Sequence, residues 1–585
     1  MIKLLKNLKR KDLLVVLIVC VLVFAQVWLE LKMPDYMSKI TTLIMTDGTK
    51  VVDVLKEGGF MLACAFGSLL SSVVVGYLVA KITARFSKTV REKLYDKVVS
   101  FNMGEIKNFS TSSLITRTTN DITNVQMFIA MGLQLMIKSP IMAIWAITKI
   151  IDKGFEWSVA TAVAVVFMLV LGIILVIIVL PRFQKVQKLI DKLNNVTREG
   201  ISGIRVIHAF NAEKYQENKF NDTNNELTGL QLFTQRTLSV MTPSMFLTMN
   251  MLTLAIYFIG AVLINAADLV VKIELFSNMV VFTSYALQVI MSFLMLAVIF
   301  IMLPRAQISA RRINEVLDTE PTIKDGKVTD SPKDGVVEFN HVSFKYPDAD
   351  EYILKDINFS CKKGETVAFI GSTGSGKSTL INLIPRFYDV TNGDIYIDGV
   401  NVKDYKLSAL HDKIGYVPQK AVMLSGTVSY NIKYGDKKNY EVTDKKVNEA
   451  IDMACASEFV DTMDGQTDAH IASGGTNVSG GQKQRLAIAR AIARDPEIFI
   501  FDDSFSALDY KTDFKLRQNL KKHCKDSTVF IVAQRIGTIM DADKIIVLDK
   551  GECKGIGTHK ELLKNCDVYR EIAYSQLSKE ELENE

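Results

Sequence analysis

Residues 366–382 read TVAFIGSTGSGKSTLIN and decide the fold of this part of the chain. A short apolar run typical of a buried strand leads into a glycine-rich stretch, and LIN opens a helix. Glycines allow successive backbone N–H groups to turn inward and hold phosphates at a helix N-terminus. Lys377 is placed to reach the β- and γ-phosphates, and Ser378 offers a hydroxyl to Mg²⁺. The sequence predicts a phosphate-binding loop made of Gly371, Ser372, Thr373, Gly374, Ser375, Gly376, Lys377, Ser378 and Thr379.

A second apolar run, 498–501, ends in Asp502. A carboxylate at a strand terminus is suited to holding Mg²⁺, usually through water. An acidic residue after four apolar ones is common in any buried strand, so this assignment depends on the phosphate loop. We therefore expect Asp502 and Ser378 to share Mg²⁺ at an ATP site.

The composition indicates a chain of two parts. At 585 residues it is too long for one domain. Hydrophobic residues make up 49%, and long uncharged runs crowd the region before about residue 304, whereas the remainder is typical of a soluble α/β domain. The net charge of +5 is small and does not indicate nucleic acid. The seven cysteines are scattered, so we expect reduced thiols and no disulfide framework.

The first part contains six runs near the length of about 20 apolar residues that a membrane-crossing helix needs. Lys3, Lys6 and Arg10 precede the first run, which favours a cytoplasmic N-terminus. A signal peptide is disfavoured because the run is long and has no small-residue cleavage site. Six crossings return the chain to the cytoplasm. The predicted spans are about 13–31, 59–80, 131–151, 157–180, 245–267 and 275–303.

The connections between these runs are unequal. Residues 81–126 and 182–236 are long, charged and rich in basic residues, which favours the cytoplasmic side. We expect them to form helices that extend well beyond the bilayer. The predicted organisation is a cytoplasmic segment 1–12, a transmembrane domain 13–320, a linker 321–335 and a nucleotide-binding domain 336–585.

Lys138 is the one clear charge inside the third run. An intramembrane charge is by default a functional hypothesis. Because Pro140 is near and the run ends outside, we favour a lysine that extends to the inner headgroups. Other polar residues, such as Gln134, Tyr285 and Gln288, either face a substrate cavity or join helices.

Between the two nucleotide motifs lies VSGGQ at 478–482, followed by KQR. It resembles the signature loop of ABC ATPases, and the other elements of that family appear in order. Tyr346 stands where the adenine-stacking aromatic is expected, Gln419 matches the glutamine loop, and SALD at 506–509 matches a loop of the dimer interface. Residues 109–121 and 199–210 resemble the two cytoplasmic coupling loops of ABC exporters. The resemblance covers nearly the whole chain.

An ABC exporter half-transporter implies a six-helix membrane domain followed by an α/β P-loop ABC ATPase domain. The resemblance implies that two such halves hold two ATP molecules with Mg²⁺ between their ATPase domains. The phosphate loop of one chain then faces the signature of the other, and ATP-driven closure switches the membrane cavity by alternating access. Gln419 joins Ser378 and Asp502 as an implied metal ligand. The residues implied to contact the partner's nucleotide are Ser479, Gly480, Gly481, Gln482 and Asp509.

Two positions depart from the family pattern. Asp503 stands where active sites usually carry the glutamate that polarises the attacking water, and Gln534 replaces a histidine. The missing methylene shortens the reach by about 1.5 Å, and a misplacement of about 1 Å can cost on the order of a hundredfold in rate. Gln534 has no cationic form. We expect a slow site; the alternative is that Asp503 works through a closer water.

An intact signature beside a weakened site is typical of one chain of heterodimeric bacterial ABC exporters. The expected partner is a second half-transporter in the bilayer of a bacterial inner membrane, with a homodimer as the alternative. The substrate class stays open among amphipathic compounds, peptides and lipids. Two other functions stay open: an importer built on the exporter fold, and an ATP-gated channel or regulatory subunit. The signature argues against the last, because a purely regulatory chain has no need to complete a working site.

Overall fold

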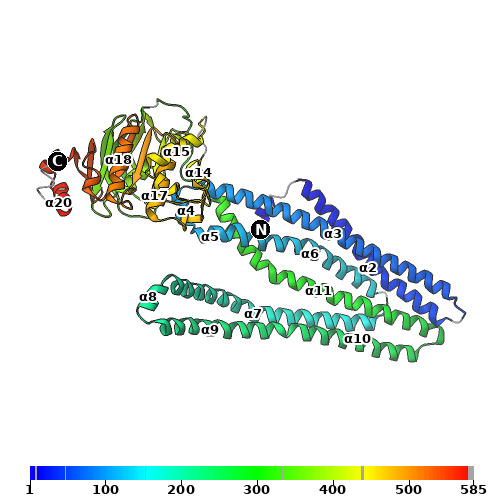
Figure 1. The fold of residues 1–585 in the computed structure, drawn as a ribbon. Helices are drawn as coiled ribbons and strands as arrows, with labels where there is room; N and C mark the ends of the chain where they lie inside the picture. Colours follow the sequence, from blue (N-terminus) through cyan, green and yellow to red (C-terminus); the bar gives the residue numbers. More distant parts are fainter. Residues whose placement is uncertain (7–9, 47, 152, 333, 436–439, 578–585) are drawn as a thin grey trace. The chain divides into compact units, whose positions relative to one another are not determined.

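The structure, a computed structural model, describes residues 1–6, 10–46, 48–151, 153–332, 334–435 and 440–577 (Figure 1). The chain forms two compact units. The helical unit comprises Met1–Val99 and Thr111–Thr319, and the sheet unit comprises Ser100–Ser110 and Glu320–Glu585. Lys333 of the predicted linker and residues 436–439 and 578–585 of the predicted nucleotide-binding domain lie outside the described residues.

Among the described residues, the helical unit contains six helices long and apolar enough to cross a membrane, which confirms the predicted number of spans. Helix α7 has 48 residues. At 1.5 Å per residue it is about 72 Å long, more than twice the roughly 30 Å of a hydrocarbon core, so the predicted extensions are also confirmed. The helices of this unit are α1 (Ile2–Leu5), α2 (Arg10–Met45), α3 (Val51–Val99), α5 (Thr111–Thr116), η1 (Arg117–Asp121), α6 (Ile122–Ile151), α7 (Phe155–Ser202), α8 (Ile204–Ala209), α9 (Glu213–Ser239), α10 (Met241–Ala266) and α11 (Leu269–Asp318).

These helices pack in two groups. Helix α2 packs against α3, α6 and α11, while α7 packs against α9 and α10. Trp157 of α7 is 1% exposed and donates its indole N–H to the carbonyl of Ile256, 3.1 Å away, which fixes α7 against α10. Large apolar side chains such as Leu70, Ile177 and Phe258 are exposed on the outer faces. Such faces suit hydrocarbon rather than water.

Lys138 has a partner that the sequence did not reveal. Its ammonium group donates to Oε1 of Glu30 at 2.8 Å, and Gln26 and Ser68 donate to the same oxygen at 2.9 and 3.1 Å. The prediction that Lys138 extends to the headgroups is therefore wrong. The ammonium turns to a carboxylate on α2 instead, because pairing removes the cost of an isolated charge in an apolar span.

Tyr285 also joins helices. Its hydroxyl donates to Asp35 at 2.6 Å and also lies 2.9 Å from the carbonyl oxygen of Leu31, and Lys149 donates to the other oxygen of Asp35 at 2.9 Å. Of the two interpretations offered for Tyr285, the structure favours interhelical contact. The carboxylate of Asp35 connects α2 to both α6 and α11.

The sheet unit is built on six strands in the order β12-β11-β3-β10-β9-β6. All neighbours are parallel except β11 and β12. Strands β9 and β10 are buried along their whole length, which explains their continuous apolar sequences. The strands of this sheet are β3 (Thr366–Gly371), β6 (Ile414–Val417), β9 (Ile498–Asp502), β10 (Thr528–Val532), β11 (Lys544–Asp549) and β12 (Glu552–Gly557).

A four-stranded antiparallel sheet, ordered β2-β1-β4-β5, and a two-stranded sheet of β7 and β8 complete this unit. These strands are β1 (Val337–Phe344), β2 (Leu354–Cys361), β4 (Asn392–Ile397), β5 (Val400–Asn401), β7 (Gly426–Thr427) and β8 (His470–Ile471). The longer helices are α4 (Met103–Asn108), α12 (Lys377–Leu383), α13 (Leu407–Asp412), α14 (Val428–Ile432), α15 (Asp444–Met453), α17 (Gly480–Ala493), α18 (Tyr510–His523), α19 (His559–Asn565) and α20 (Asp567–Gln576). Shorter helical turns are α16 (Ser457–Val460), η2 (Gln466–Asp468), η3 (Ser473–Gly475) and η4 (Ile536–Thr538).

Parallel strands place their carboxyl ends at one edge of a sheet, and ligands of open α/β sheets bind there. The segments that leave β3, β6, β9 and β10 therefore converge. These four segments carry the phosphate loop, Gln419, Asp503 and Gln534.

Candidate nucleotide site and signature loop

The phosphate loop joins β3 to α12, as the sequence predicts. Gly374 and Gly376 have φ angles of +84° and +99°, in the left-handed region that favours glycine. A Cβ at Gly376 would come within 2.7 Å of a Leu354 methyl group, whereas one at Gly374 would meet nothing within 4 Å. The loop is therefore supported on one side and open on the other, as a phosphate cradle requires.

Lys377 is folded across this loop. Its ammonium group donates to the carbonyls of Gly371 and Ser372, each at 2.8 Å. Burial lowers the pKa of Lys377, and the negative charges of Asp503 and Asp502 oppose that effect. The ammonium thus lies at the loop that is predicted to bind the phosphates.

The expected metal ligands come together beside it. Ser378 donates from Oγ to Oδ1 of Asp502 at 2.8 Å. Burial raises the pKa of Asp502; the bond from Ser378 opposes this, and the charge of Asp503 adds to it. Gln419 uses its amide N–H for another bond, which leaves its carbonyl oxygen as an acceptor. A hydroxyl, a carboxylate and an amide oxygen are the hard ligands that Mg²⁺ prefers, so these residues fit that ion.

The two residues that depart from the family pattern contact each other. Oδ2 of Asp503 accepts a hydrogen bond from Nε2 of Gln534 at 2.8 Å and another from Nε2 of Gln419 at 3.2 Å. Asp503 is 8% exposed, and its φ of +47° lies in a region that aspartate tolerates better than most residues. Burial raises its pKa, and the bond from Gln419 opposes this. One carboxylate oxygen is thus occupied by two amides.

Tyr346 lies close to the phosphate loop. Its hydroxyl is 3.0 Å from Oγ1 of Thr379, and Tyr388 packs edge-on against its ring with centroids 5.2 Å apart. Lys107 of α4 places its ammonium 5.5 Å from the ring centroid. A hollow of about 80 Å³ is lined by Tyr346, Tyr388 and Lys107 together with Glu105 and Thr322. The sequence had given no signal for Lys107 or Tyr388, because neither belongs to a motif.

The signature loop lies at the start of α17. Ser479 caps this helix: its hydroxyl accepts from the backbone N–H of Gln482 at 3.3 Å, and Gln482 Oε1 accepts from the backbone N–H of Ser479 at 2.8 Å. Ser479 and Gly480 are exposed. A Cβ at Gly481 would lie 3.2 Å from the carbonyl of Ala507, so the loop borders the SALD segment.

Asp509, at the end of that segment, caps α18 by accepting from the N–H of Thr512 at 3.0 Å. This hydrogen bond lowers the pKa of Asp509. Over the described part of the sheet unit, no hydrogen bond or ion pair joins Ser479–Gln482 or Asp509 to the phosphate loop. The structure therefore brings together the phosphate loop, Gln419, Asp502, Asp503, Gln534 and Tyr346. The SALD segment adjoins this group at its first residue, because Ser506 Oγ donates to the carbonyl of Asp503 at 2.8 Å, whereas the printed bonds of Ser479–Gln482 and Asp509 serve helix capping.

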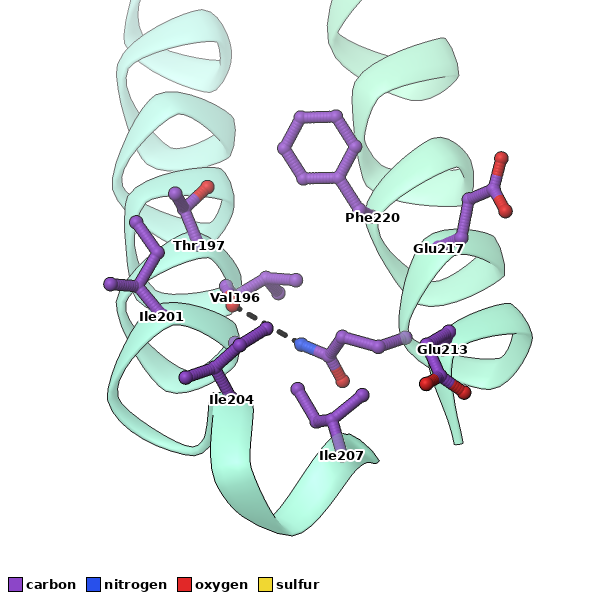
Figure 2. A pocket seen from close by; sticks show the side chains of 10 residues that line it. Val196, Thr197, Ile201, Ile204, Ile207, Glu213, Glu217 and Phe220 are labelled. Carbon is purple, nitrogen blue, oxygen red and sulfur yellow. Dashed lines mark hydrogen bonds between the residues drawn. The ribbon is translucent and has the colours of Figure 1, made fainter. Parts of the chain in front are cut away.

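The second predicted coupling loop forms α8 and its flanks in the helical unit. Figure 2 shows apolar side chains of α7, α8 and α9 around a cavity of about 290 Å³, which Gln216 helps to close by donating to the carbonyl of Val196 at 3.3 Å. Ile201 is 71% exposed and Phe210 is 78% exposed. The tip is thus apolar and uncovered in this chain.

Comparisons with known proteins agree with this architecture. Residues 16–316 match the family model of the ABC transporter transmembrane region, and residues 354–506 match the ABC transporter model. The chain is 36% identical to an uncharacterized ABC transporter ATP-binding protein of Mycobacterium tuberculosis, over 92% of this chain and 93% of that one. It is 33% identical to the probable multidrug resistance ABC transporter ATP-binding/permease protein YheI of Bacillus subtilis, over 83% and 82% of the two chains.

Among solved structures, a bacterial Atm1-family ABC exporter with ATP bound shares the fold. The TM-score is 0.80 at 22% identity, and the match covers 96% of this chain and 98% of that one. The membrane helices, the parallel sheet with its phosphate loop, and the order of the motifs have one common explanation. The chain belongs to the ABC transporter family, as a half-transporter that carries its membrane domain and its ATPase domain in one polypeptide.

Proposed function

We propose that this chain is one half of a heterodimeric ABC exporter in which its own nucleotide site holds ATP and turns over slowly. The observation that carries the proposal is the double hydrogen bond to Oδ2 of Asp503 from Gln534 and Gln419. A general base needs a carboxylate oxygen that reaches the attacking water. Asp503 is one methylene short of glutamate, and one of its oxygens is already engaged.

The remaining residues support binding. Lys377 and the backbone N–H groups of Gly374–Ser378 hold the phosphates, while Tyr346 offers its ring to the adenine. Ser378, Asp502 and Gln419 supply oxygen ligands to Mg²⁺, which neutralises phosphate charge when it is bound. Each of these groups already makes a hydrogen bond at or beside the phosphate loop: Lys377 with Gly371, Ser378 with Asp502, and Tyr346 with Thr379. The site is therefore equipped for affinity more than for hydrolysis.

The signature loop supports the need for a partner. Ser479 and Gly480 are exposed, and their hydrogen bonds only organise the start of α17. In the proposed complex they face the nucleotide on the partner's phosphate loop, and Asp509 lies at the same interface. The uncovered apolar tip at Ile201 and Phe210 is a second surface suited to a partner chain.

The substrate class is an amphipathic compound, a peptide or a lipid, carried outward across a bacterial inner membrane. The similarity to YheI, a probable multidrug resistance transporter of Bacillus subtilis, favours the first of these. The N-terminus and the ATPase domain are assigned to the cytoplasm. The second candidate function is an ATP-gated regulatory subunit, which the engaged carboxylate of Asp503 favours, because such a subunit binds ATP without hydrolysing it.

The test compares the purified chain alone with the chain purified together with a half-transporter that has Glu and His at the two altered positions. We expect the lone chain in lipid vesicles to hydrolyse ATP at most at about one tenth of the rate of the pair. Asp503→Glu together with Gln534→His should raise the rate of the lone chain by about tenfold or more. Rapid hydrolysis by the unaltered lone chain contradicts the slow site.

Transport in the same vesicles separates the pump from the regulatory subunit. We expect labelled amphipathic dyes to move in the direction from the ATPase side only when the pair is present. ATP-dependent conductance without directed uptake would favour the gated subunit, and movement in the opposite direction would favour an importer.

A further inference from the structure

The chain passes between its two units at three places: after Val99, after Ser110 and after Thr319. The second passage leads into α5 and α6, and the third leaves α11. In each unit, a buried carboxylate connects the segment next to the second passage with the segment next to the third passage.

In the sheet unit, the connection is made by Glu105 of α4, which is 3% exposed. Its Oε1 accepts from the backbone N–H of Thr322 at 3.0 Å and from the Thr322 hydroxyl at 2.7 Å, while Oε2 accepts from the N–H of Asn102 at 2.9 Å. Burial opposes ionisation, but these hydrogen bonds, led by the Thr322 hydroxyl, hold the pKa of Glu105 below its ordinary value. Thr322 follows the third passage by three residues.

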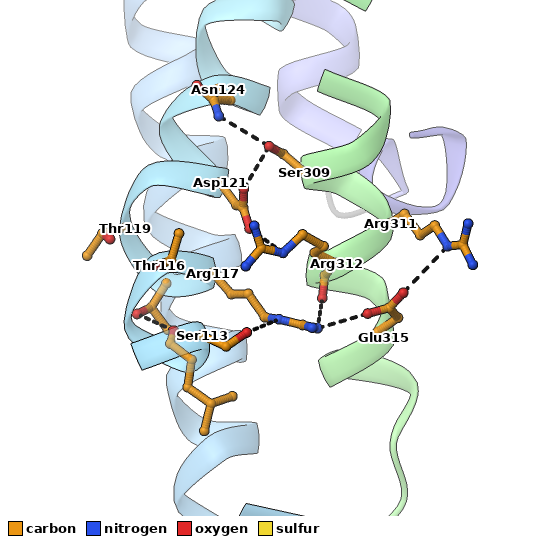
Figure 3. A network of polar contacts seen from close by, with 12 residues as sticks. Ser113, Thr116, Arg117, Thr119, Asp121, Asn124, Ser309, Arg311, Arg312 and Glu315 are labelled. Carbon is orange, nitrogen blue, oxygen red and sulfur yellow. Dashed lines mark hydrogen bonds and ion pairs between the residues drawn. The ribbon is translucent and has the colours of Figure 1, made fainter. Parts of the chain in front are cut away.

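In the helical unit, the connection is made by the turn that precedes α6 (Figure 3). Asp121 is 4% exposed; its Oδ1 accepts from Ser309 Oγ at 2.8 Å, and its Oδ2 lies 3.4 Å from Nε of Arg312. Arg117 donates to the carbonyl of Arg312 at 2.6 Å and to Glu315 at 3.1 Å. Glu315 precedes the third passage by four residues.

The turn Arg117–Asp121 is π-helical. π-Helical turns are rare in proteins, but those that occur are often found at functional sites. Here the wider turn carries both Arg117 and Asp121, and both of these side chains reach α11. A purely local role for the turn does not account for two contacts with the same distant helix.

We propose that these contacts form a double clasp, with Glu105–Thr322 on one side of the passages and Arg117/Asp121–Ser309/Arg312/Glu315 on the other. The clasp makes the start of α6 and the end of α11 one connected element, so that displacement driven by nucleotide enters both helices together. Without the clasp, α6 and α11 are joined to the sheet unit only by separate stretches of backbone, so each helix can respond to nucleotide independently of the other. Glu105 and Asp121 are positioning residues in this scheme, which rests on the proposed ATP-driven switching.

The test uses an intrinsic probe. The chain has three tryptophans, Trp28, Trp145 and Trp157, and all lie in helices of the helical unit. Their fluorescence therefore reports membrane helices rather than the ATPase domain. The full chain with its partner half, in nanodiscs of phosphatidylethanolamine and phosphatidylglycerol, is measured before and after addition of MgATP and vanadate. The partner contributes the same background to every variant.

Glu105→Gln and Asp121→Asn keep the side-chain size and remove the charge. We expect the affinity for a fluorescent ATP analogue to change by less than about twofold, while the tryptophan response falls by about threefold or more. The matched control is Glu226→Gln, which removes an ion pair with Lys192. The Glu226 side chain is 61% exposed, so this pair lies at the surface. Glu226→Gln should leave both measurements unchanged.

A charge exchange, Arg117→Glu with Glu315→Arg, should recover part of the response that either single change removes. A full response in both Glu105→Gln and Asp121→Asn overturns the clasp. Should either variant unfold, Thr322→Val removes the hydroxyl bond to Glu105 and Ser309→Ala removes the bond to Asp121 from the other side, and a full response in both overturns the clasp equally. If the unaltered pair gives no response, the proposed ATP-driven switching is wrong and the clasp falls with it.

Discussion

The phosphate-loop cluster and the signature loop lie in the same unit but differ in where their polar groups find partners. In the cluster, Ser378 binds Asp502 while Gln419 and Gln534 bind Asp503, so the groups satisfy one another inside the protein. In the signature loop, the side chains of Ser479 and Gln482 each accept from the other's backbone N–H and cap a helix. The polar groups of the first region are paired with one another, whereas the exposed residues of the second are those proposed to face the partner's nucleotide.

This difference indicates that ATP binding and ATP hydrolysis can be altered by substitutions at different positions of the sequence. A nucleotide at the phosphate loop meets groups that are already arranged. In the proposed function, hydrolysis at this site is limited by Asp503, because its Oδ2 accepts hydrogen bonds from two amide side chains. Substitutions in the two regions should therefore fail in different assays.

The largest effect is expected from Lys377→Ala in the full chain. It removes the cation at the phosphate loop, and hydrogen bonds to charged groups contribute about 1.5–3 kcal/mol. Affinity for a labelled ATP analogue should fall by roughly tenfold to hundredfold, measured by equilibrium binding. Lys560→Ala, an exposed lysine of α19, serves as the control. Unchanged affinity in Lys377→Ala would refute the phosphate loop.

A smaller effect is expected from Gly480→Asp in the assembled pair. A Cβ at Gly480 meets nothing within 4 Å, and an acidic residue suits the first turn of α17, so the chain's own fold is undisturbed. The carboxylate repels the partner's triphosphate. Steady-state ATPase should fall by about tenfold, and Gly480→Ala should stay within about twofold. Full activity of Gly480→Asp would show that the signature loop does not meet a nucleotide.

The smallest effect is expected from Asp503→Asn in the same pair. Because this site is proposed to be slow, the steady-state ATPase should change by less than about twofold, in contrast with the equivalent change in the partner. Asn also keeps an oxygen that can accept from Gln534 and Gln419. A loss as large as that of Gly480→Asp would assign hydrolysis to this chain and remove the contrast between its two regions.

The parts of the structure that the sequence predicted are those set by local patterns. Hydropathy located the six spans, and the glycine pattern located the phosphate loop between β3 and α12. The contacts of Lys138 and Asp503 were not predicted, because each depends on packing across long separations. Glu30 is 108 residues from Lys138. Gln534 reaches Asp503 because the parallel register of β9 and β10 sets Val532 beside Asp502.

The same limit applies to Lys107. Residues 109–121 resemble a coupling loop, but Lys107 lies in the preceding helix α4 and outside that match. Only the fold places it over the ring of Tyr346. Motifs identify the residues that bind ATP, whereas tertiary structure identifies their neighbours.

The ion pair between Glu30 and Lys138 has a consequence for biosynthesis. At about 5–20 residues per second, roughly 5–20 s separate the synthesis of these two residues. During that interval Glu30 has hydrogen-bond donors in Gln26 and Ser68 but lacks the ammonium of Lys138, and a charged side chain in a membrane helix is costly to insert. The strongly apolar remainder of α2 carries this cost until α6 enters the bilayer and supplies the neutralising ammonium. Glu30 thus contacts both α3 and α6, and a chain stopped before Lys138 lacks the ammonium that pairs with it.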